Sequence, residues 1–210
     1  TTTDATDNNS TYTLTSADVG KQVRGVVGYL DGYGTQESVN SAASTTVANN
    51  LVIRGNSLYT IVDGPSWTHA EANSVKLGGH LVTINNAEEN ALVYSLAIAN
   101  NAGLIGLYDP SGTNKWIWSS GNKVDYLNWS PDKRPYVGIE KWANILYMNF
   151  EGKYLGYWNT HQSGPGMYNS PGIAETPFIR RGDSAYVIVQ GPTWEEAEAN
   201  AVKLGGHLVT

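Results

Sequence analysis

The sequence predicts an α+β domain that follows a short all-β segment. Three observations support this prediction: an internal duplication that sets the length of the domain, two helix patterns near its start, and strand and loop patterns over the rest of it. Two helices early in a domain, followed by strands and long loops, are typical of the α+β class.

The composition is typical of an extracellular protein with long polar loops. Of the 210 residues, 40% are hydrophobic and only 15% are charged. The formal net charge is -6 and the sequence shows no basic stripe. We therefore expect no nucleic acid partner. No apolar run approaches the roughly 20 residues that a membrane-spanning helix needs, so we expect no membrane span.

The absence of cysteine excludes several classes of site. Zinc fingers, iron–sulfur clusters, disulfide frameworks and thiol catalysis all require cysteine, and the chain has none. The sequence also lacks a Ser-His-Asp order, a phosphate-binding loop and a histidine cluster, so we expect no enzyme. Seven Trp and thirteen Tyr against two Phe indicate aromatic side chains that meet both apolar groups and water.

Residues 54–83 and residues 181–210 are two copies of one sequence. The copies begin at Arg54 and Arg181, an offset of 127 residues, and 22 of the 30 aligned positions are identical. A tandem repeat of this kind marks a structural unit. We therefore predict one domain over residues 54–180 and the start of a second domain over residues 181–210, and we expect the natural protein to continue.

The Arg-Gly-Asp triplet at 181–183 resembles a cell-attachment motif. The first copy has Arg54-Gly55-Asn56 at the same place, so we interpret both triplets as turns. Integrin-type adhesion is the weaker alternative.

Of two histidines in the first copy, one is replaced in the second copy and the other is retained. His69 is replaced by Glu196, so the unit does not depend on imidazole chemistry there. His80 is retained as His207 within a Leu-Gly-Gly-His-Leu run, where we expect a packing role.

Residues 1–50 show short alternating runs and no helix pattern. Strands are expected at 11–15, 23–30 and 35–47, with a turn at 31–34 and a linker at 48–50. This segment resembles the last strands of bacterial immunoglobulin-like or cadherin-like adhesin repeats. A small independent hairpin is the alternative, since such sandwiches usually take about 100 residues.

The predicted domain begins with a strand at 58–62 and two helices. The first helix starts at the Ser66 N-cap and ends at Gly78-Gly79, and the second starts at Asn86 and fades at Asn100. Their inward stripes consist of Trp67, Ala70, Ser74 and Leu77 in the first, and Leu92, Val93 and Leu96 in the second. From Leu104 onward the pattern is strand and loop.

Six segments in order resemble the C-type lectin-like domain family, over nearly the whole of residues 54–180. They are residues 67–72 with 77–84, residues 88–90, Leu104-Ile-Gly-Leu107, Trp116-Ile-Trp118 with Tyr126-Leu-Asn-Trp129, Trp158-Asn159, and Gly172-Ile-Ala-Glu175. The resemblance implies the C-type lectin-like fold, with two helices, small antiparallel sheets and a long loop. The disulfide positions of the family fall on Ser74 with Ala174 and on Trp142 with Ser163, as in disulfide-free bacterial members.

The resemblance also implies a candidate calcium and sugar site in the long loop. Sugar-binding members place oxygen ligands on either side of a cis-proline, and here Arg134 and Tyr136 flank Pro135. Glu140 and Asn159 stand at ligand positions, but the triplet Trp158-Asn159-Thr160 lacks the final Asp of the family. Since Ca²⁺ needs six to eight oxygens, we expect a degenerate metal site, with Glu140 and Asn159 as its remaining ligands.

Aromatic residues of the loop suggest a ligand-binding surface that does not depend on the ion. The candidate ligand-binding residues are Arg134, Tyr136, Glu140, Tyr157, Trp158, Asn159 and Tyr168. The alternative is that Trp129 and Trp158 are core residues, as the resemblance to the family implies. Tyr136, Tyr157 and Tyr168 are then the better surface candidates.

Two functions remain open at this stage. The first is an extracellular adhesion or recognition module on a bacterial cell surface, whose loop binds glycans or neighbouring surface proteins. The second is a structural spacer or filament-forming repeat with a degenerate lectin site. Because first and last strands pair in this family, residues 57–83 and 184–210 could compete for one place in the fold, and their exchange could produce self-association.

Overall fold

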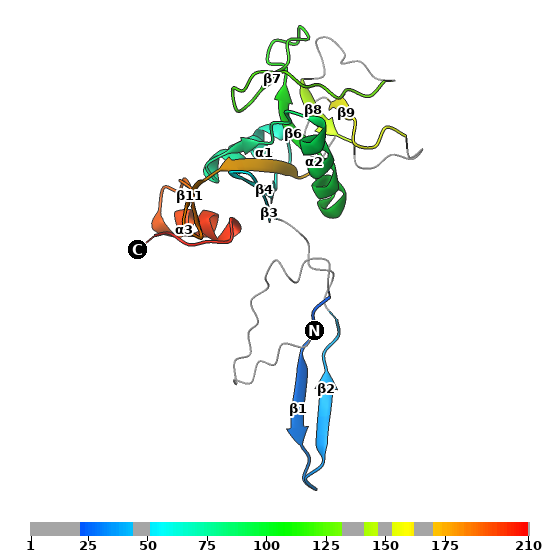
Figure 1. Cartoon of the computed structure of the whole chain (residues 1–210), viewed down its shortest axis with the longest axis vertical. Helices are drawn as coiled ribbons and strands as arrows, with labels where there is room; N and C mark the ends of the chain where they lie inside the picture. The colour runs from blue at the N-terminus through cyan, green and yellow to red at the C-terminus, as the bar shows by residue number, and fades with distance from the viewer. Residues whose placement is uncertain (1–21, 44–50, 132–140, 147–152, 162–169, 210) are drawn as a thin grey trace. The chain divides into compact units, whose positions relative to one another are not determined.

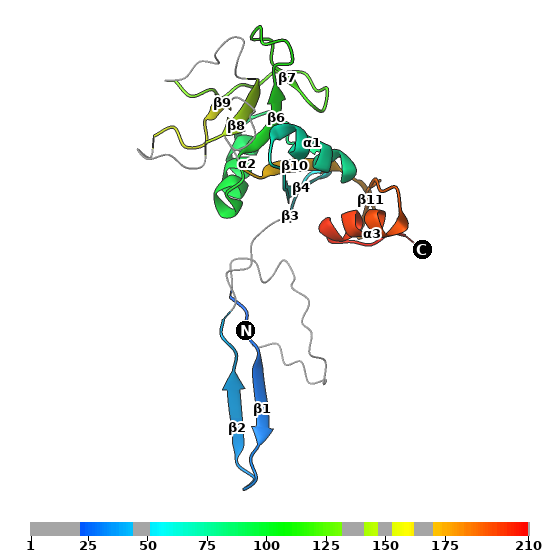
Figure 2. The ribbon, with the colours of Figure 1, turned by 180° about the vertical axis from the view of Figure 1, so that it is seen from behind.

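The structure is a computed structural model, and it describes residues 22–43, 51–131, 141–146, 153–161 and 170–209 (Figures 1 and 2). The chain forms two compact units, residues 1–49 and residues 50–210. The domain boundaries predicted at 1–50, 54–180 and 181–210 stay predictions. The predicted strand at 11–15 and linker at 48–50 lie outside the described residues.

The described part of the first unit is a β-hairpin of β1 (Val26–Leu30) and β2 (Gln36–Asn40). Its turn is closed by Asp31, whose Oδ1 accepts hydrogen bonds from the backbone N–H groups of Tyr33 (2.9 Å) and Thr35 (2.8 Å). Every residue of both strands is exposed. The two predicted strands are confirmed but shorter, and the immunoglobulin-like assignment stays a prediction.

The second unit contains an eight-stranded sheet, in which residues 172–177, near the end of the predicted domain, lie beside the hairpin at its start, and a separate two-stranded sheet in the second copy. The strand order is β3-β4-β10-β6-β8-β9, while β5 pairs with β10 and β7 pairs with β6. The strands are β3 (Leu51–Arg54), β4 (Ser57–Val62), β5 (His80–Leu81), β6 (Leu104–Tyr108), β7 (Ile117–Trp118), β8 (Trp142–Ile145), β9 (Trp158–His161) and β10 (Gly172–Pro177). The predicted α+β architecture is confirmed, and β3 is an addition to it.

Both helices begin at the predicted N-caps. Ser66 Oγ accepts the N–H of His69 at the start of α1 (Trp67–Lys76), and Asn86 Oδ1 accepts the N–H of Glu89 at the start of α2 (Ala87–Asn100). Asn101 ends α2 in the left-handed conformation, with φ of 52°. The predicted inward stripe of α1 is confirmed, since Trp67, Ala70, Ser74 and Leu77 are all buried.

Two apolar clusters fill the interior, one under each helix. The cluster under α1 is built around Trp67, Leu77 and Leu81, and the cluster under α2 contains Val93, Leu96 and two fully buried tryptophans. Trp67 joins its helix to the sheet, because its Nε1–H donates to the carbonyl of Ile105 at 2.8 Å. Burying an indole in this way stabilises the domain and satisfies its one polar atom.

His80 does not have the packing role that its sequence neighbours suggested. Its side chain is 42% exposed, and its Nδ1 lies 2.6 Å from Glu71 Oε1. The other oxygen of Glu71 accepts the N–H of Leu81 (2.9 Å) and the hydroxyl of Ser119 (3.0 Å). His80 is therefore a polar partner of the carboxylate that fixes the chain between α1 and β5.

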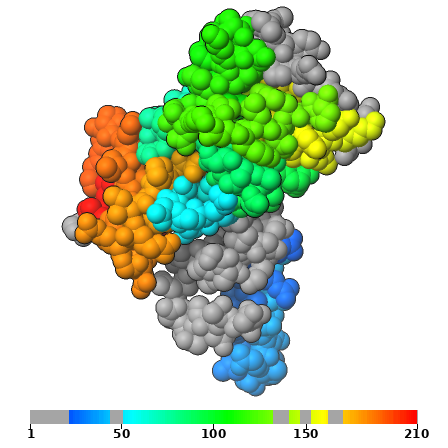
Figure 3. All heavy atoms as spheres, turned by 45° about the horizontal axis from the view of Figure 1, so that its top comes forward, coloured from blue at the N-terminus to red at the C-terminus, as the bar shows by residue number. Residues whose placement is uncertain are grey.

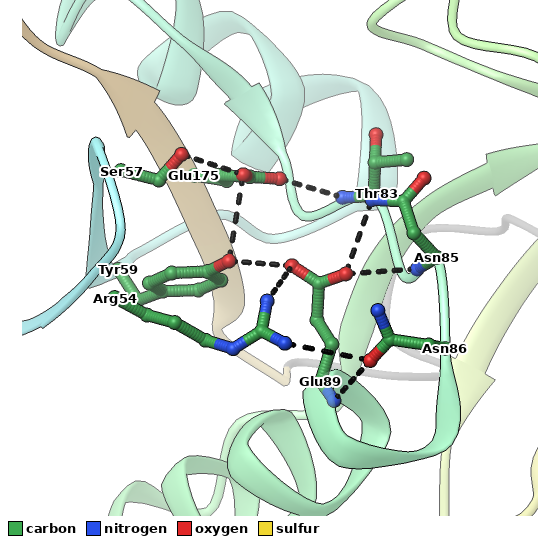
Figure 4. A network of polar contacts seen from close by, with 8 residues as sticks. All are labelled: Arg54, Ser57, Tyr59, Thr83, Asn85, Asn86, Glu89 and Glu175. Atoms are coloured by element: carbon green, nitrogen blue, oxygen red, sulfur yellow. Dashed lines mark hydrogen bonds and ion pairs between the residues drawn. The ribbon is translucent and has the colours of Figure 1, made fainter.

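A polar network joins β4, α2 and β10, which come from distant parts of the sequence (Figure 4). The Tyr59 hydroxyl donates to Glu89 Oε1 at 2.5 Å and lies 3.4 Å from Glu175 Oε1. Arg54 Nη1 lies 3.3 Å from Glu89 Oε1, and Ser57 Oγ donates to Glu175 Oε1 at 2.8 Å. We call these five residues the clamp. Three of its members belong to the first hairpin, so the clamp fixes that hairpin to the rest of the domain.

The second copy repeats the local structure of the first. It contains β11 (Ile179–Arg181), β12 (Ser184–Tyr186) and α3 (Trp194–Lys203), the last capped by Thr193 Oγ1. Both triplets form turns as predicted, with φ of 59° at Gly55 and 58° at Gly182, where a side chain would be strained. In Figure 3 the second copy, coloured orange to red, lies on the surface beside the first.

The clamp predicts a pH dependence of stability. Burial raises the pKa of Glu175 above the ordinary value, and the nearby Glu89 carboxylate adds to the rise. The folded state then binds this proton more tightly than the unfolded state does, so this contribution to stability is complete below the ordinary carboxyl pKa and is lost as the pH rises through the raised value.

We expect Glu175→Gln to remove this loss. The free energy of unfolding of the wild type, relative to the variant, should fall as the pH rises from the ordinary carboxyl pKa through the raised one, by at most about 1.4 kcal/mol per pH unit. Urea unfolding at a series of pH values measures this fall, with the exposed Glu195→Gln as control. Parallel curves for wild type and Glu175→Gln would contradict the assignment.

Candidate functional site

The candidate site lies on β9 and the turn before it. Of the predicted ligand-binding residues, Tyr157, Trp158 and Asn159 are described here. Arg134, Tyr136, Glu140 and Tyr168 lie outside the described residues. The geometry of the site is therefore built from β9, its support and the aromatic residues around it.

The turn at 154–157 is held from several sides. The carbonyl of Gly156 accepts the side-chain amides of Asn90 (2.9 Å) and Asn128 (3.0 Å), and its N–H donates to the carbonyl of Leu146 at 2.7 Å. Tyr154 and Gly156 both have positive φ, 57° and 82°. Tyr154 is a bulky residue in a sparsely populated conformation, which persists because these bonds over-determine the turn.

The prediction that Trp158 binds a ligand with its side chain is corrected by the structure, because this side chain lies in the core. Its side chain is fully buried, and its Nε1–H donates to Asn90 Oδ1 at 2.7 Å. The rings of Trp118 and Tyr126 lie edge-on to it, each with centroids 5.6 Å away. Trp158 is a core residue, and it aligns its neighbours on β9 by anchoring the strand.

A column of indoles runs from this core towards the surface. Trp129 lies edge-on to Trp158 with centroids 5.9 Å apart, and Trp116 lies 4.9 Å from Trp129. Trp129 and Trp116 are half-buried, and Trp116 Nε1–H donates to Asn114 Oδ1 at 2.8 Å. The sequence analysis missed the Trp116–Trp129 pair and the support from Asn90. The inward position of Asn90 on α2, three residues before Val93, was the available signal.

Tyr157 is the exposed ring of the site, and Tyr126, Tyr154 and Asn159 are half-buried around the same turn. Tyr157 is 37% exposed and lies edge-on to Tyr154, with ring centroids 6.0 Å apart. Burial raises the pKa of the neighbouring Tyr126, and Tyr157 and Glu88 add to this rise, so the Tyr126 hydroxyl stays protonated and able to donate. We call Tyr126, Tyr154, Tyr157 and Asn159 the tyrosine face. Such a surface offers ring faces for stacking and hydroxyl groups for hydrogen bonds.

The described residues do not make a calcium site on their own. Asn159 is half-buried, and its Oδ1 accepts the N–H of Thr160 at 2.9 Å. Among the described residues there is no group of three His, Cys, Asp or Glu side chains placed to hold a metal ion. One amide oxygen is far short of the six to eight oxygens that Ca²⁺ takes.

Two substitutions separate the scaffold from the tyrosine face. We expect Trp158→Ala to lower the free energy of unfolding by about 3–5 kcal/mol, because it empties a fully buried site. Tyr157→Ala should cost less than about 1 kcal/mol, because its ring is partly in water. Chemical denaturation of the two variants measures this. Equal losses would show that Tyr157 also belongs to the core.

Known proteins with similar sequences include several lectins and lectin-like proteins. The sequence model described as the Lectin C-type domain matches residues 63–161. The galactose-specific lectin nattectin of Thalassophryne nattereri is 30% identical over 134 residues, which cover 60% of this chain and 79% of that protein. Struthiocalcin-2 of Struthio camelus is 35% identical over 103 residues, covering 41% and 72%. A type-2 ice-structuring protein of Hemitripterus americanus is 31% identical over 78 residues, covering 36% and 45%.

Solved structures share the fold at lower identity. A calcium-independent type II antifreeze protein superposes with a TM-score of 0.51 and 23% identity, covering 64% of this chain and 96% of that one. Human lithostathine superposes with a TM-score of 0.51 and 20% identity, covering 63% and 91%.

Proposed function

This chain belongs to the C-type lectin domain family, and on that premise we propose that it is a non-enzymatic extracellular recognition module that binds glycans. The observation that carries the proposal is the tyrosine face, which the turn at 154–157 and the core residue Trp158 hold in place. Family members among the relatives include a galactose-specific lectin.

The chemistry of the tyrosine face supports a carbohydrate ligand. Sugar rings present apolar faces of C–H groups and rims of hydroxyl groups, which match aromatic rings with polar atoms at their edges. Tyr157, just before β9, supplies an exposed ring, and Asn159, two residues later in β9, supplies amide hydrogen-bonding groups. Glycans are accordingly the proposed partners, and neighbouring surface proteins are the alternative.

The proposed binding mode relies on stacking more than on an ion. In this proposal Arg134, Tyr136, Glu140 and Tyr168 are further ligand-binding residues, as the sequence suggested. The cation Arg134 stands beside Pro135, where the resemblance implied an oxygen ligand. A positive charge disfavours Ca²⁺ nearby, so calcium is proposed at most as a weak ligand of Glu140 and Asn159.

We expect galactose-terminated glycans to bind the wild type on a glycan array. Tyr157→Ala should lower their affinity at least about tenfold, which corresponds to about 1.4 kcal/mol or more of binding free energy. Tyr33→Ala is the matched control, because Tyr33 is 97% exposed and belongs to the hairpin unit. The array is repeated with a chelator.

Each outcome of this experiment decides between functions. Binding that is lost in chelator would contradict the weak role given to calcium. No glycan binding, with a melting temperature unchanged by chelator, would contradict the lectin proposal and favour a structural spacer or filament-forming repeat.

The second candidate function is self-association through residues 57–83 and 184–210, within a repeat protein at a bacterial cell surface. One observation favours it: apolar side chains of the second copy are exposed, including Trp194 at 66% and Ile188 at 87%. Exposed apolar patches commonly mark a surface that binds protein. No helix among the described residues is long and apolar enough to span a membrane.

A further inference from the structure

The two copies share a tight turn and a capped ten-residue helix but differ strongly in burial. Trp67 is 6% exposed and its counterpart Trp194 is 66% exposed, while Tyr59 is 1% exposed and Tyr186 is 44% exposed. The difference arises because β4 and α1 pack on β10 and the strands beside it, whereas Tyr186 and Trp194 remain on the surface. We call the place occupied by β4, α1 and β5 against β10 the slot.

The second copy keeps the side chains that fix the first copy in the slot. Arg54, Ser57, Tyr59, Trp67, Glu71 and His80 correspond to Arg181, Ser184, Tyr186, Trp194, Glu198 and His207. The pair Glu198 and His207 already makes the internal contact of Glu71 and His80, and Leu208 N–H donates to Glu198 as Leu81 N–H does to Glu71. The second copy therefore already has the internal contacts that the first copy makes when it occupies the slot.

The topology allows the second copy to reach the slot within one molecule. In the slot, Ser57 pairs with Pro177, the last residue of β10, and the Phe178 N–H donates to the carbonyl of Asn56 at 2.8 Å. The end of β10 is thus already beside the start of β4. If Ser184 took the place of Ser57, residues 178–183 would form a hairpin loop that crosses the roughly 4.8 Å between neighbouring strands.

We propose that residues 184–210 are a second occupant of the slot, which replaces residues 57–83 in the same molecule. The domain then has two arrangements, one built from residues 54–180 and one built from residues 84–210. This inference rests on the duplicated segments and is independent of glycan binding. Replacement within one molecule has a higher effective concentration than exchange between molecules, so it dominates in dilute solution.

The first copy is the favoured occupant for two reasons. Leu58 is 4% exposed in the slot, and its counterpart is the smaller Ala185, which would leave a cavity. In addition, the first copy gains pairing between β3 and β4 in the slot. When the second copy occupies the slot, β11 becomes part of the hairpin loop and cannot pair with β12 in the same way. The arrangement with the second copy is therefore the minor one in the wild type.

The test disables one copy at a time in the full chain. Ala70 is fully buried in α1, and its counterpart in α3 is Ala197. We expect Ala70→Asp to remain a cooperatively folded monomer of lower stability, Ala197→Asp to behave as the wild type, and the double variant to lose cooperative unfolding. The indole N–H of Trp67 donates to Ile105 in the slot, so slow hydrogen exchange of an indole N–H reports the occupant by nuclear magnetic resonance.

In Ala70→Asp, we expect the slowly exchanging indole to be Trp194. Three results would overturn the proposal: an Ala70→Asp variant as unfolded as the double variant, a folded variant in which Trp194 exchanges fast, or a folded variant that is a dimer by analytical ultracentrifugation. The last result would assign the second copy to the slot of a neighbouring molecule.

A milder variant avoids the risk that Asp simply unfolds the chain. Ala185→Leu restores the side chain that Leu58 places in the slot, so the protected fraction of the Trp194 indole should rise by at least about tenfold over the wild type. The exposed substitution Val202→Leu on α3 is the matched control. Equal protection of Trp194 in wild type and Ala185→Leu would overturn the proposal.

Discussion

The hydrogen bond from Tyr59 to the buried carboxylate of Glu89 is the interaction on which the rest of this structure depends. It joins the first long strand of the domain to its second helix, and the nearby Glu175 brings the last strand to the same point. Two carboxylates so close together repel each other, and the hydroxyl of Tyr59 and the guanidinium of Arg54 offset that repulsion. Without cysteine, the domain relies on this polar contact where beginning and end of the fold meet.

The tyrosine face is organised by the same principle at the other end of the sheet. A buried amide, Asn90, binds both the indole of Trp158 and the carbonyl of Gly156, so one residue of α2 fixes β9 and the turn before it. The exposed ring of Tyr157 is thus held in place by buried groups behind it. Preorganisation of this kind reduces the conformational entropy lost on binding, which favours recognition by a few stacking side chains.

The sequence predicted those features that depend on neighbouring residues, and it was less successful where distant residues meet. Ser66 and Asn86 are caps because of the three residues that follow each of them, and the Gly55 and Gly182 turns are equally local. Trp158 is buried because a partner 68 residues away accepts its N–H, which no local pattern shows. His80 was misassigned because its apolar neighbours suggested burial, whereas its partner Glu71 lies on the preceding helix. The strand β3 was missed because it exists only by pairing with β4.

The duplication provides an internal control for the clamp, because Tyr59 and Tyr186 have equivalent sequence positions and opposite burial. The most direct measurement is the free energy of unfolding of Tyr59→Phe and Tyr186→Phe, each obtained by urea denaturation at pH 7. If the hydroxyl of Tyr59 holds the first copy in place, Tyr59→Phe loses about 1–3 kcal/mol, the cost of leaving a buried hydrogen-bond partner unsatisfied, and Tyr186→Phe loses almost nothing. Equal losses in the two variants, or no loss in either, would contradict this account.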